Sequence, residues 1–345
     1  MSGTGRPSSR APSRSLRYLR SHWLDWVAYA ISLAGLTYVI WNLHLPQLID
    51  DLLHVTWWVV AVAILVDISP RLLEAVRWKY LLRPLRIKYG HVLQAIYVGT
   101  LYSGILPLSA GELVRAVMVS WRTRVSCASV LATQLVERVA DAIALVLIVC
   151  LTFGGLALPG SLRVALIFLV SLIILVLIVG LVLFARRKGL WARIDASQPA
   201  GGLGRWFKSL VVRMQASGIR LTGRALVVAE STAIAIAFIR VGVIRLLLAA
   251  YHLELPFLQV AGLYGIITVG SFLPNAPGKL GSWMFFCALG LELFGVTSSQ
   301  AAGFSLVAYV FWTLPPILLG FGALTASPFS WSELRPRRNL MEVEQ

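Results

Sequence analysis

The fold is set by a stretch that occurs twice, as Ser103-Gly-Ile-Leu-Pro107-Leu-Ser-Ala-Gly111-Glu-Leu113 and, 167 positions later, as Gly270-Ser-Phe-Leu-Pro274-Asn-Ala-Pro-Gly278-Lys-Leu280. Both copies carry the pattern Pro-x-x-x-Gly-x-Leu within apolar sequence. Proline and glycine interrupt helices, and an interrupted helix at membrane depth is tolerated only where it is packed in protein or lines a cavity. Paired interruptions in two halves of a chain point to a transport site. We therefore predict two broken helices that together shape such a site.

The composition is that of a polytopic membrane protein. The chain has 345 residues, of which 58% are hydrophobic and only 13% are charged. Its formal net charge is +16, but the basic residues mostly lie in short segments beside apolar runs, as in the cytoplasmic loops of membrane proteins. We therefore do not expect nucleic acid as a partner. The three cysteines are widely separated and have no metal-ligand spacing, so neither a disulfide framework, a metal nor another cofactor is expected.

Apolar periodicity predicts an all-α bundle of membrane helices. Segments long enough to span a bilayer lie at 23–43, 55–77, 126–153, 161–185, 225–250 and 300–325. Two further apolar segments, 91–121 and 257–294, contain the Pro/Gly motifs. Aromatic residues near the span ends, among them Trp41, Trp57 and Trp78, are predicted to be interfacial anchors.

The distribution of Lys and Arg predicts the orientation. Five Arg precede the first span and none lies in 44–54 beyond it, which places the N-terminus in the cytoplasm. Segment 91–121 has basic residues on both flanks, so we predict a re-entrant hairpin that enters from the cytoplasm. The flanks of 257–294 contain neither Lys nor Arg, so the second hairpin is predicted to enter from outside.

Span, hairpin and span thus occur twice with opposite polarity, at 55–153 and at 225–325. This is an inverted-topology repeat, which many transporters use. The predicted domain order is a basic cytoplasmic arm (1–22), the transmembrane domain (23–325) and a cytoplasmic tail (326–345). The basic loop 186–224 is either an interfacial helix on an anionic leaflet or a solvated connection.

Ionisable residues within the predicted spans are candidates for mechanism, since each costs about 2.5–3.5 kcal/mol at the bilayer centre on insertion scales. In span 126–153, Glu137 and Asp141 share a helix face, and Arg138 lies between them in the sequence. Arg138 offers a planar guanidinium suited to phosphate. The functional interpretation is a headgroup or proton-coupling site, and the alternative is a buried ion network that fixes helix packing.

Charged residues also follow both Pro/Gly breaks. Glu112 and Arg115 are predicted in the first turns of a helix after the first break, and Lys279 lies at the equivalent place after the second. Two helix N-termini that approach the membrane centre from opposite sides, each with a cation nearby, would suit a phosphate ester. The alternative for Arg115 and Lys279 is that they extend to the membrane interface.

Two other spans carry internal charges. Arg240 lies near the middle of span 225–250, so it needs a carboxylate, a carbonyl or a ligand from another segment. In span 55–77, Asp67, Arg71 and Glu74 have spacings of i,i+4 and i,i+3, which favour structural ion pairs.

The motifs resemble those of a flippase-like transmembrane family, which includes the membrane domain of lysylphosphatidylglycerol synthases and free-standing relatives proposed to move lipids or polyprenyl-linked intermediates. The resemblance covers about residues 55–325 and is carried by Leu106-Pro-Leu-Ser-Ala-Gly-Glu-Leu-Val-Arg115, Leu135-Val-Glu-Arg-Val-Ala-Asp141 and Leu273-Pro-Asn-Ala-Pro-Gly-Lys-Leu-Gly281. It implies a lipid-translocating role. The family motif positions fall on Pro107, Gly111, Glu112, Arg115, Glu137, Arg138, Asp141, Pro274, Pro277, Gly278 and Gly281.

The second half departs from the family pattern. Ser282-Trp-Met284 stands where relatives often have an Arg-Glu pair, and Val310 stands where they often have Arg. Both departures remove charge. The soluble aminoacyl-transfer domain of the synthases is not recognised either, so we do not expect this chain to make lysylphosphatidylglycerol itself.

Together these patterns predict a multi-pass flippase or transporter in the inner (plasma) membrane that moves an anionic or polyprenyl-linked lipid. Its N- and C-termini are expected in the cytoplasm. The expected partners are the membrane and a phospholipid or lipid-linked substrate, with a homo-oligomer left open. No catalytic motif is found, so an enzyme is not expected. Two alternatives remain: a membrane-embedded enzyme with Glu137 and Asp141 as an acid/base pair, and a scaffold whose basic loop docks a lipid synthase.

Overall fold

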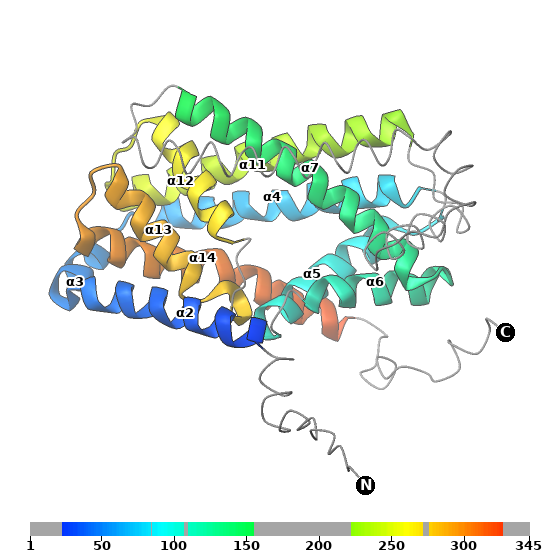
Figure 1. The fold of residues 1–345 in the computed structure, drawn as a ribbon, viewed down its shortest axis with the longest axis horizontal. Coiled ribbons are helices and arrows are strands. Elements are labelled where there is room, and N and C mark those ends of the chain that lie inside the picture. Colours follow the sequence, from blue (N-terminus) through cyan, green and yellow to red (C-terminus); the bar gives the residue numbers. More distant parts are fainter. Residues whose placement is uncertain (1–22, 84, 107–109, 155–221, 272–275, 327–345) are drawn as a thin grey trace, which may run out of the picture.

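The computed structural model describes residues 23–83, 85–106, 110–154, 222–271 and 276–326. Within these ranges there are ten α-helices, one 3₁₀ turn and no strand. The helices are α2 (Trp23–Asn42), α3 (Leu45–His54), α4 (Trp57–Leu81), α5 (Tyr89–Ile105), α6 (Ala110–Thr123), α7 (Cys127–Gly154), α11 (Gly223–Ala250), α12 (Phe257–Gly270), α13 (Ser282–Leu293) and α14 (Ser298–Thr325), and the 3₁₀ turn is η1 (Pro277–Lys279). Figure 1 shows their arrangement as an elongated bundle. The prediction of an all-α fold is confirmed.

Five of the six predicted spans correspond to α2, α4, α7, α11 and α14, and the sixth, at 161–185, lies outside the described residues. By length and apolar composition, α11 and α14 are each able to cross a membrane, and α2 with α3 counts as a third span bent by 83°. The helices α4 and α7 are similarly long but do not meet this criterion, because charged side chains run through their middle.

At the centre of the bundle, α4 and α11 lie side by side and antiparallel. The backbone N–H of Thr56, just before α4, donates to the carbonyl of Ala250 at the end of α11 with an N–O distance of 3.0 Å. The buried face of α11 carries alanine at every fourth position, as Ala225, Ala229, Ala233 and Ala237. Small residues at this spacing let two helix backbones approach closely, which suits packing within a membrane.

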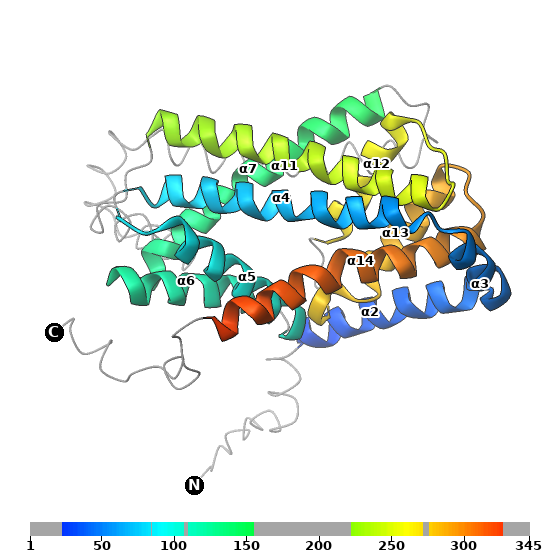
Figure 2. The same cartoon turned by 180° about the vertical axis from the view of Figure 1, so that it is seen from behind.

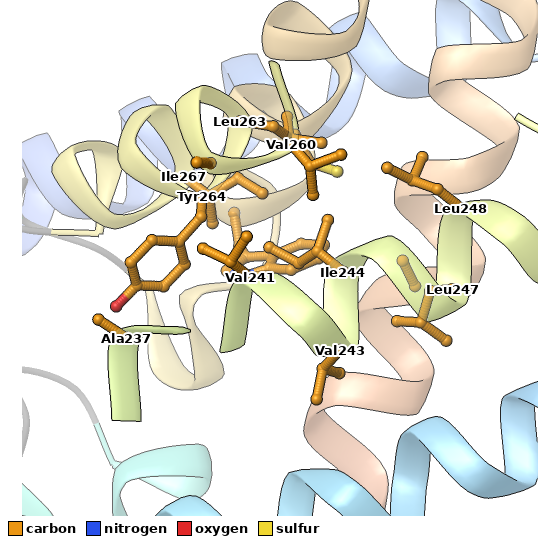
Figure 3. Packing of buried hydrophobic residues seen from close by; sticks show 14 of the residues in the cluster. Ala237, Val241, Val243, Ile244, Leu247, Leu248, Val260, Leu263, Tyr264 and Ile267 are labelled. Carbon is orange, nitrogen blue, oxygen red and sulfur yellow. The ribbon is translucent and has the colours of Figure 1, made fainter. Parts of the chain in front are cut away.

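The apolar core continues from α11 onto α12. Figure 3 shows Val241, Ile244 and Leu248 of α11 beside Val260 and Leu263 of α12. All five side chains are at most 3% exposed. This contact holds the first half of the second broken segment against the central helix pair.

Both Pro/Gly motifs interrupt helices, as predicted. The first separates α5 from α6, and the second separates α12 from α13. In each case the two halves pack against each other as a pair. Figures 1 and 2 show that the α5–α6 pair opens toward one end of the bundle and the α12–α13 pair toward the opposite end.

The two broken segments meet inside the bundle. A Cβ atom added to Gly278 would lie 3.4 Å from the carbonyl oxygen of Gly104. The hydroxyl of Tyr309 donates to the carbonyl oxygen of Gly278 at 2.9 Å and ties this segment to α14. Gly278 and Gly281 have φ values of 67° and 81°, a left-handed conformation that favours glycine, so the second break requires both residues.

Apart from the two breaks inside the bundle, the described connections that carry Lys or Arg gather at one end. They are the connections from α4 to α5 and from α6 to α7, which contain Arg83, Arg86, Lys88 and Arg124, and the beginning of α11 lies at the same end (Figure 1). At the opposite end lie the connections at 43–44, 55–56, 251–256 and 294–297, which contain neither Lys nor Arg. The three-dimensional arrangement therefore separates basic from non-basic connections.

Candidate functional site

Among the described residues, the most buried charged side chain is that of Arg77 of α4, which is 3% exposed. Its Nη1 atom lies 2.6 Å from Asp141 Oδ1, and its Nε atom lies 3.3 Å from Glu137 Oε1. The second oxygen of Glu137 accepts from Arg115 Nη2 at 3.2 Å. Arg77 and Arg115 thus hold the Glu137 carboxylate between α4 and α6.

Arg138 extends this cluster toward α6. Its guanidinium pairs with Glu112, and its Nη1 atom lies 4.0 Å from Asp141 Oδ2. The six charges therefore form a chain of alternating sign: Glu112, Arg138, Asp141, Arg77, Glu137 and Arg115. We call this set the six-charge network. It is neutral overall, and Arg138, with 51% of its side chain exposed, is its most accessible member.

An aromatic ring completes the surroundings of Arg115. The guanidinium carbon lies 4.4 Å from the centroid of the Trp78 ring, in cation–π geometry. The Trp78 indole N–H donates to Thr133 Oγ1 at 2.9 Å, and the side chain is fully buried. The prediction that Trp78 is an interfacial anchor was therefore wrong. The helix continues to Leu81 and carries Trp78 into the protein, whereas Trp41 and Trp57 are exposed.

A second group of charges joins α4 to α11. Arg71 Nη1 lies 2.9 Å from Glu74 Oε2, and Arg240 Nη2 lies 3.0 Å from Glu74 Oε1. Arg240 thus has the carboxylate partner that its position predicted, and Glu74 supplies it from another helix. The predicted Arg71–Glu74 pair is also formed. The predicted i,i+4 pair of Asp67 with Arg71 is not formed, since Asp67 makes no ion pair within the described ranges.

Lys279 lies at the end of η1, beside the second break. Its side chain is exposed, and it makes no ion pair with any residue that the structure describes. Its charged neighbours are Arg138, Arg240 and Arg71, all of which repel it. Lys279 is therefore within electrostatic range of three arginines.

Lys279 was predicted in the first turn of a helix, and this prediction was wrong. The helix α13 begins only at Ser282, because Lys279 itself has a φ of 60° and Gly281 one of 81°. The predicted position of Glu112 and Arg115 in the first turns of α6 is confirmed. The cation after the first break therefore lies within the following helix, whereas the cation after the second break precedes it.

Gly111 and Gly281 allow two close backbone contacts. A Cβ on Gly111 would collide with the carbonyl oxygen of Gly99 where α5 and α6 meet. A Cβ on Gly281 would collide with the carbonyl oxygen of Ser32 on α2. These glycines shape the site through packing. The predicted site residues Pro107 and Pro274 lie outside the described residues, and Pro277 begins η1.

Sequence reasoning missed Arg77 as a member of this cluster. It fell at the last position of the predicted span 55–77, where a cation is expected to reach the membrane interface. Since α4 extends to Leu81, Arg77 lies one turn deeper than predicted. The missed signal is the presence of Glu137 and Asp141 on one face of α7, which together need a cation from another helix.

These features define an all-helical membrane protein with a charged interior and two interrupted helices. Residues 26–320 match the family model described as "Lysylphosphatidylglycerol synthase TM region". The chain belongs to this family, which confirms the predicted resemblance and identifies a membrane protein of a family linked to lipid metabolism. No match is found among curated proteins or among solved structures.

Proposed function

We propose that the protein moves an anionic lipid, either a phospholipid or a polyprenyl-linked lipid, across the inner membrane. The observation that carries this proposal is the excess of positive charge where the two broken segments meet. Lys279 lies among Arg71, Arg138 and Arg240 without a carboxylate partner of its own in the described part of the chain. Cations crowded together at membrane depth are stabilised by an anion, and a phosphate headgroup supplies one.

We further propose that α5–α6 and α12–α13 are re-entrant hairpins of two inverted repeats. The helix packing supports this. The last helix of each repeat packs against the first half of the other hairpin, since α14 contacts α5 and α7 contacts α12. The first helices of the two repeats, α4 and α11, pack against each other. This pattern is expected when two halves are related by a pseudo-two-fold axis in the membrane plane.

In this proposal the end of the bundle that bears Arg83, Arg86 and Lys88 faces the cytoplasm. Positive charge near helix ends is enriched on that side. Both termini would then be cytoplasmic. The hairpins would enter from opposite sides, and their tips would meet between the two leaflets.

The charged residues divide into two roles. Lys279 and Arg240 would attract the headgroup, and the half-exposed Arg138 would exchange its pair with Glu112 for the phosphate. The buried members of the six-charge network would hold α4, α6 and α7 in place. Because Glu137 and Asp141 are ion-paired with Arg77, we do not propose them as an acid/base pair, and we propose a transporter and not an enzyme.

Lipid binding tests the proposed site directly. Mass spectrometry of lipids that copurify with the detergent-solubilised protein is expected to find anionic lipid on the wild type. Lys279→Gln should lower its amount about tenfold, because hydrogen bonds to charged groups contribute roughly 1.5–3 kcal/mol. Lys88→Gln, at the exposed basic end, is the matched control and should retain the lipid. Equal lipid on all three proteins would contradict the proposed site.

A further inference from the structure

Asp67 of α4 lies between two small pockets at the contact of α4 with its neighbours. One pocket is lined by Asp67 and Arg71 together with Tyr97 of α5 and Pro315 of α14. The other is lined by Asp67 with Val243 of α11 and Trp312 of α14. Asp67 therefore lines both small pockets in the middle of a predicted span.

Asp67 differs from the four carboxylates that pair with arginine. Glu74, Glu112, Glu137 and Asp141 each form a direct ion pair with arginine. Asp67 makes neither a hydrogen bond nor an ion pair with the residues that the structure describes. An unpaired carboxylate at membrane depth is costly when charged, so it is stabilised either by a cation or by a proton.

Arg71 is able to serve either of two carboxylates. It lies four residues after Asp67 and three before Glu74, and both spacings place the side chains on one helix face. In the structure it is paired with Glu74, which Arg240 also holds at 3.0 Å. Glu74 would therefore keep a partner if Arg71 turned to Asp67. The site thus has two arginines and two carboxylates, and in the structure both arginines pair with Glu74.

The surroundings of Asp67 contain few other charges. On α4 it is within electrostatic range of Arg71 and Glu74, and on α11 of Arg240. Tyr97 faces it from α5, and α14 contributes apolar pocket residues such as Phe311 and Pro315. The charged residues of the nearby α7 are paired within the six-charge network. The charge of Asp67 is therefore free to change without breaking an ion pair. Glu230 of α11, whose buried Oε1 has no hydrogen-bond partner, also makes no ion pair within the described ranges, but it does not line these pockets.

We propose that Asp67 binds a proton that is transported together with the anionic headgroup, an inference that rests on the proposed function. When Asp67 is protonated, Arg71, Arg240 and Lys279 face only Glu74 as counter-charge, and their affinity for an anion is highest. When Asp67 releases the proton to water on the other side, its carboxylate attracts Arg71 and competes with the headgroup. The two ligands thus bind cooperatively. One proton with one singly charged headgroup carries no net charge, so a pH gradient would drive the movement.

The first test uses the full chain in vesicles of phosphatidylcholine and phosphatidylglycerol that contain fluorescent phosphatidylglycerol. With a gradient of one pH unit, wild-type protein should enrich the labelled lipid up to about tenfold in the leaflet that faces the less acidic side, because one unit corresponds to a factor of ten per proton. Asp67→Asn should give no gradient-driven enrichment, and Asp67→Glu should restore it. Asp50→Asn, on the exposed face of α3, is the matched control and should behave as wild type.

The second test does not depend on transport. Infrared difference spectra recorded across a pH titration should contain a protonated carboxyl band in the wild-type protein that is absent in Asp67→Asn and present in Asp50→Asn. If wild-type protein moves the lipid but ignores the pH gradient, the coupling is overturned and the proposed function stands. If it moves no anionic lipid, the proposed function fails, and the coupling that rests on it fails too. If the carboxyl band is unchanged in Asp67→Asn, proton binding at Asp67 is overturned.

Discussion

At the scale of single residues, the interior separates paired charges from unpaired ones. The members of the six-charge network neutralise one another, and Arg77 contacts two carboxylates on α7. Lys279 and Asp67 have no such partner among the described residues. Paired buried charges serve packing when their geometry is good, whereas unpaired charges at membrane depth point to a ligand. This distinction underlies the roles proposed above for the buried members of the network and for Lys279 and Asp67.

Arg77→Met is expected to destabilise the protein by about 3–5 kcal/mol, because it leaves Glu137 and Asp141 without their shared cation. Thermal unfolding of the detergent-solubilised protein measures this change. Arg86→Met is the control, since Arg86 is exposed at the basic end. Similar stability of the two variants would show that Arg77 does not support the fold.

Gly111→Ala is expected to destabilise the contact of α5 with α6 by about 1–3 kcal/mol, because the added methyl group meets the carbonyl oxygen of Gly99. Gly242→Ala, in the middle of α11, is the matched control. Its Cβ would have open space, so the better helix propensity of alanine should stabilise the protein by about 0.5–1 kcal/mol. Unfolding measurements that rank the two variants in the reverse order would refute this view of the close contact.

At the scale of elements, ion pairs connect helices that are distant in the sequence. Arg240 of α11 reaches Glu74 of α4, and Arg77 of α4 reaches Asp141 of α7. The first contact joins the two central helices, and the second joins α4 to its neighbour α7. The breaks between α5 and α6 and between α12 and α13 then bring further cations to the same region.

The pair Arg240–Glu74 should show direct energetic coupling between α4 and α11. In a double-mutant cycle with Arg240→Gln and Glu74→Gln, we expect a coupling free energy of about 0.5–3 kcal/mol from unfolding data. Glu74→Gln alone should cost more, because it leaves both Arg71 and Arg240 without their carboxylate. Additivity of the two changes would mean that the contact contributes no stability of its own.

The sequence predicted the helices and their breaks better than the contacts of individual side chains between helices. The helix predicted at 225–250 is observed as Gly223–Ala250, and both Pro/Gly motifs interrupt helices. Apolar runs and helix breakers are local signals, so they carry this information. The partner of Arg240 lies 166 positions away, and the burial of Trp78 depends on helices that pack around it. The partner of Arg240 and the burial of Trp78 depend on tertiary packing, which local patterns in a single sequence do not reveal.

At the scale of the whole molecule, the bundle has a basic end and an end without Lys or Arg in its connections. The two broken segments open toward opposite ends and meet between them (Figures 1 and 2). This geometry suits alternating access, in which one site is reached first from one side and then from the other. Together with the enrichment of positive charge on the cytoplasmic side, it underlies the orientation proposed above.

Cysteine labelling tests that orientation. In a background where Cys127, Cys150 and Cys287 are replaced by alanine, Glu254→Cys should react with a membrane-impermeant maleimide added to intact cells. Arg86→Cys should react only after the membrane is permeabilised, because the basic end is expected in the cytoplasm. Both positions are exposed, so access from water is the remaining difference between them. Reversed labelling would invert the proposed topology.

The most direct test of the central proposal is the movement of fluorescent phosphatidylglycerol between the leaflets of vesicles that contain the purified protein. Quenching of the outer leaflet by a membrane-impermeant reductant measures this movement. Wild-type protein is expected to move the lipid well above the rate of protein-free vesicles, Lys88→Gln to retain this activity, and Lys279→Gln to lose about nine-tenths of it, as the charge-assisted contact implies. Movement at the protein-free rate, or equal movement by wild type and Lys279→Gln, would contradict the proposal that the cations between the two breaks carry an anionic lipid.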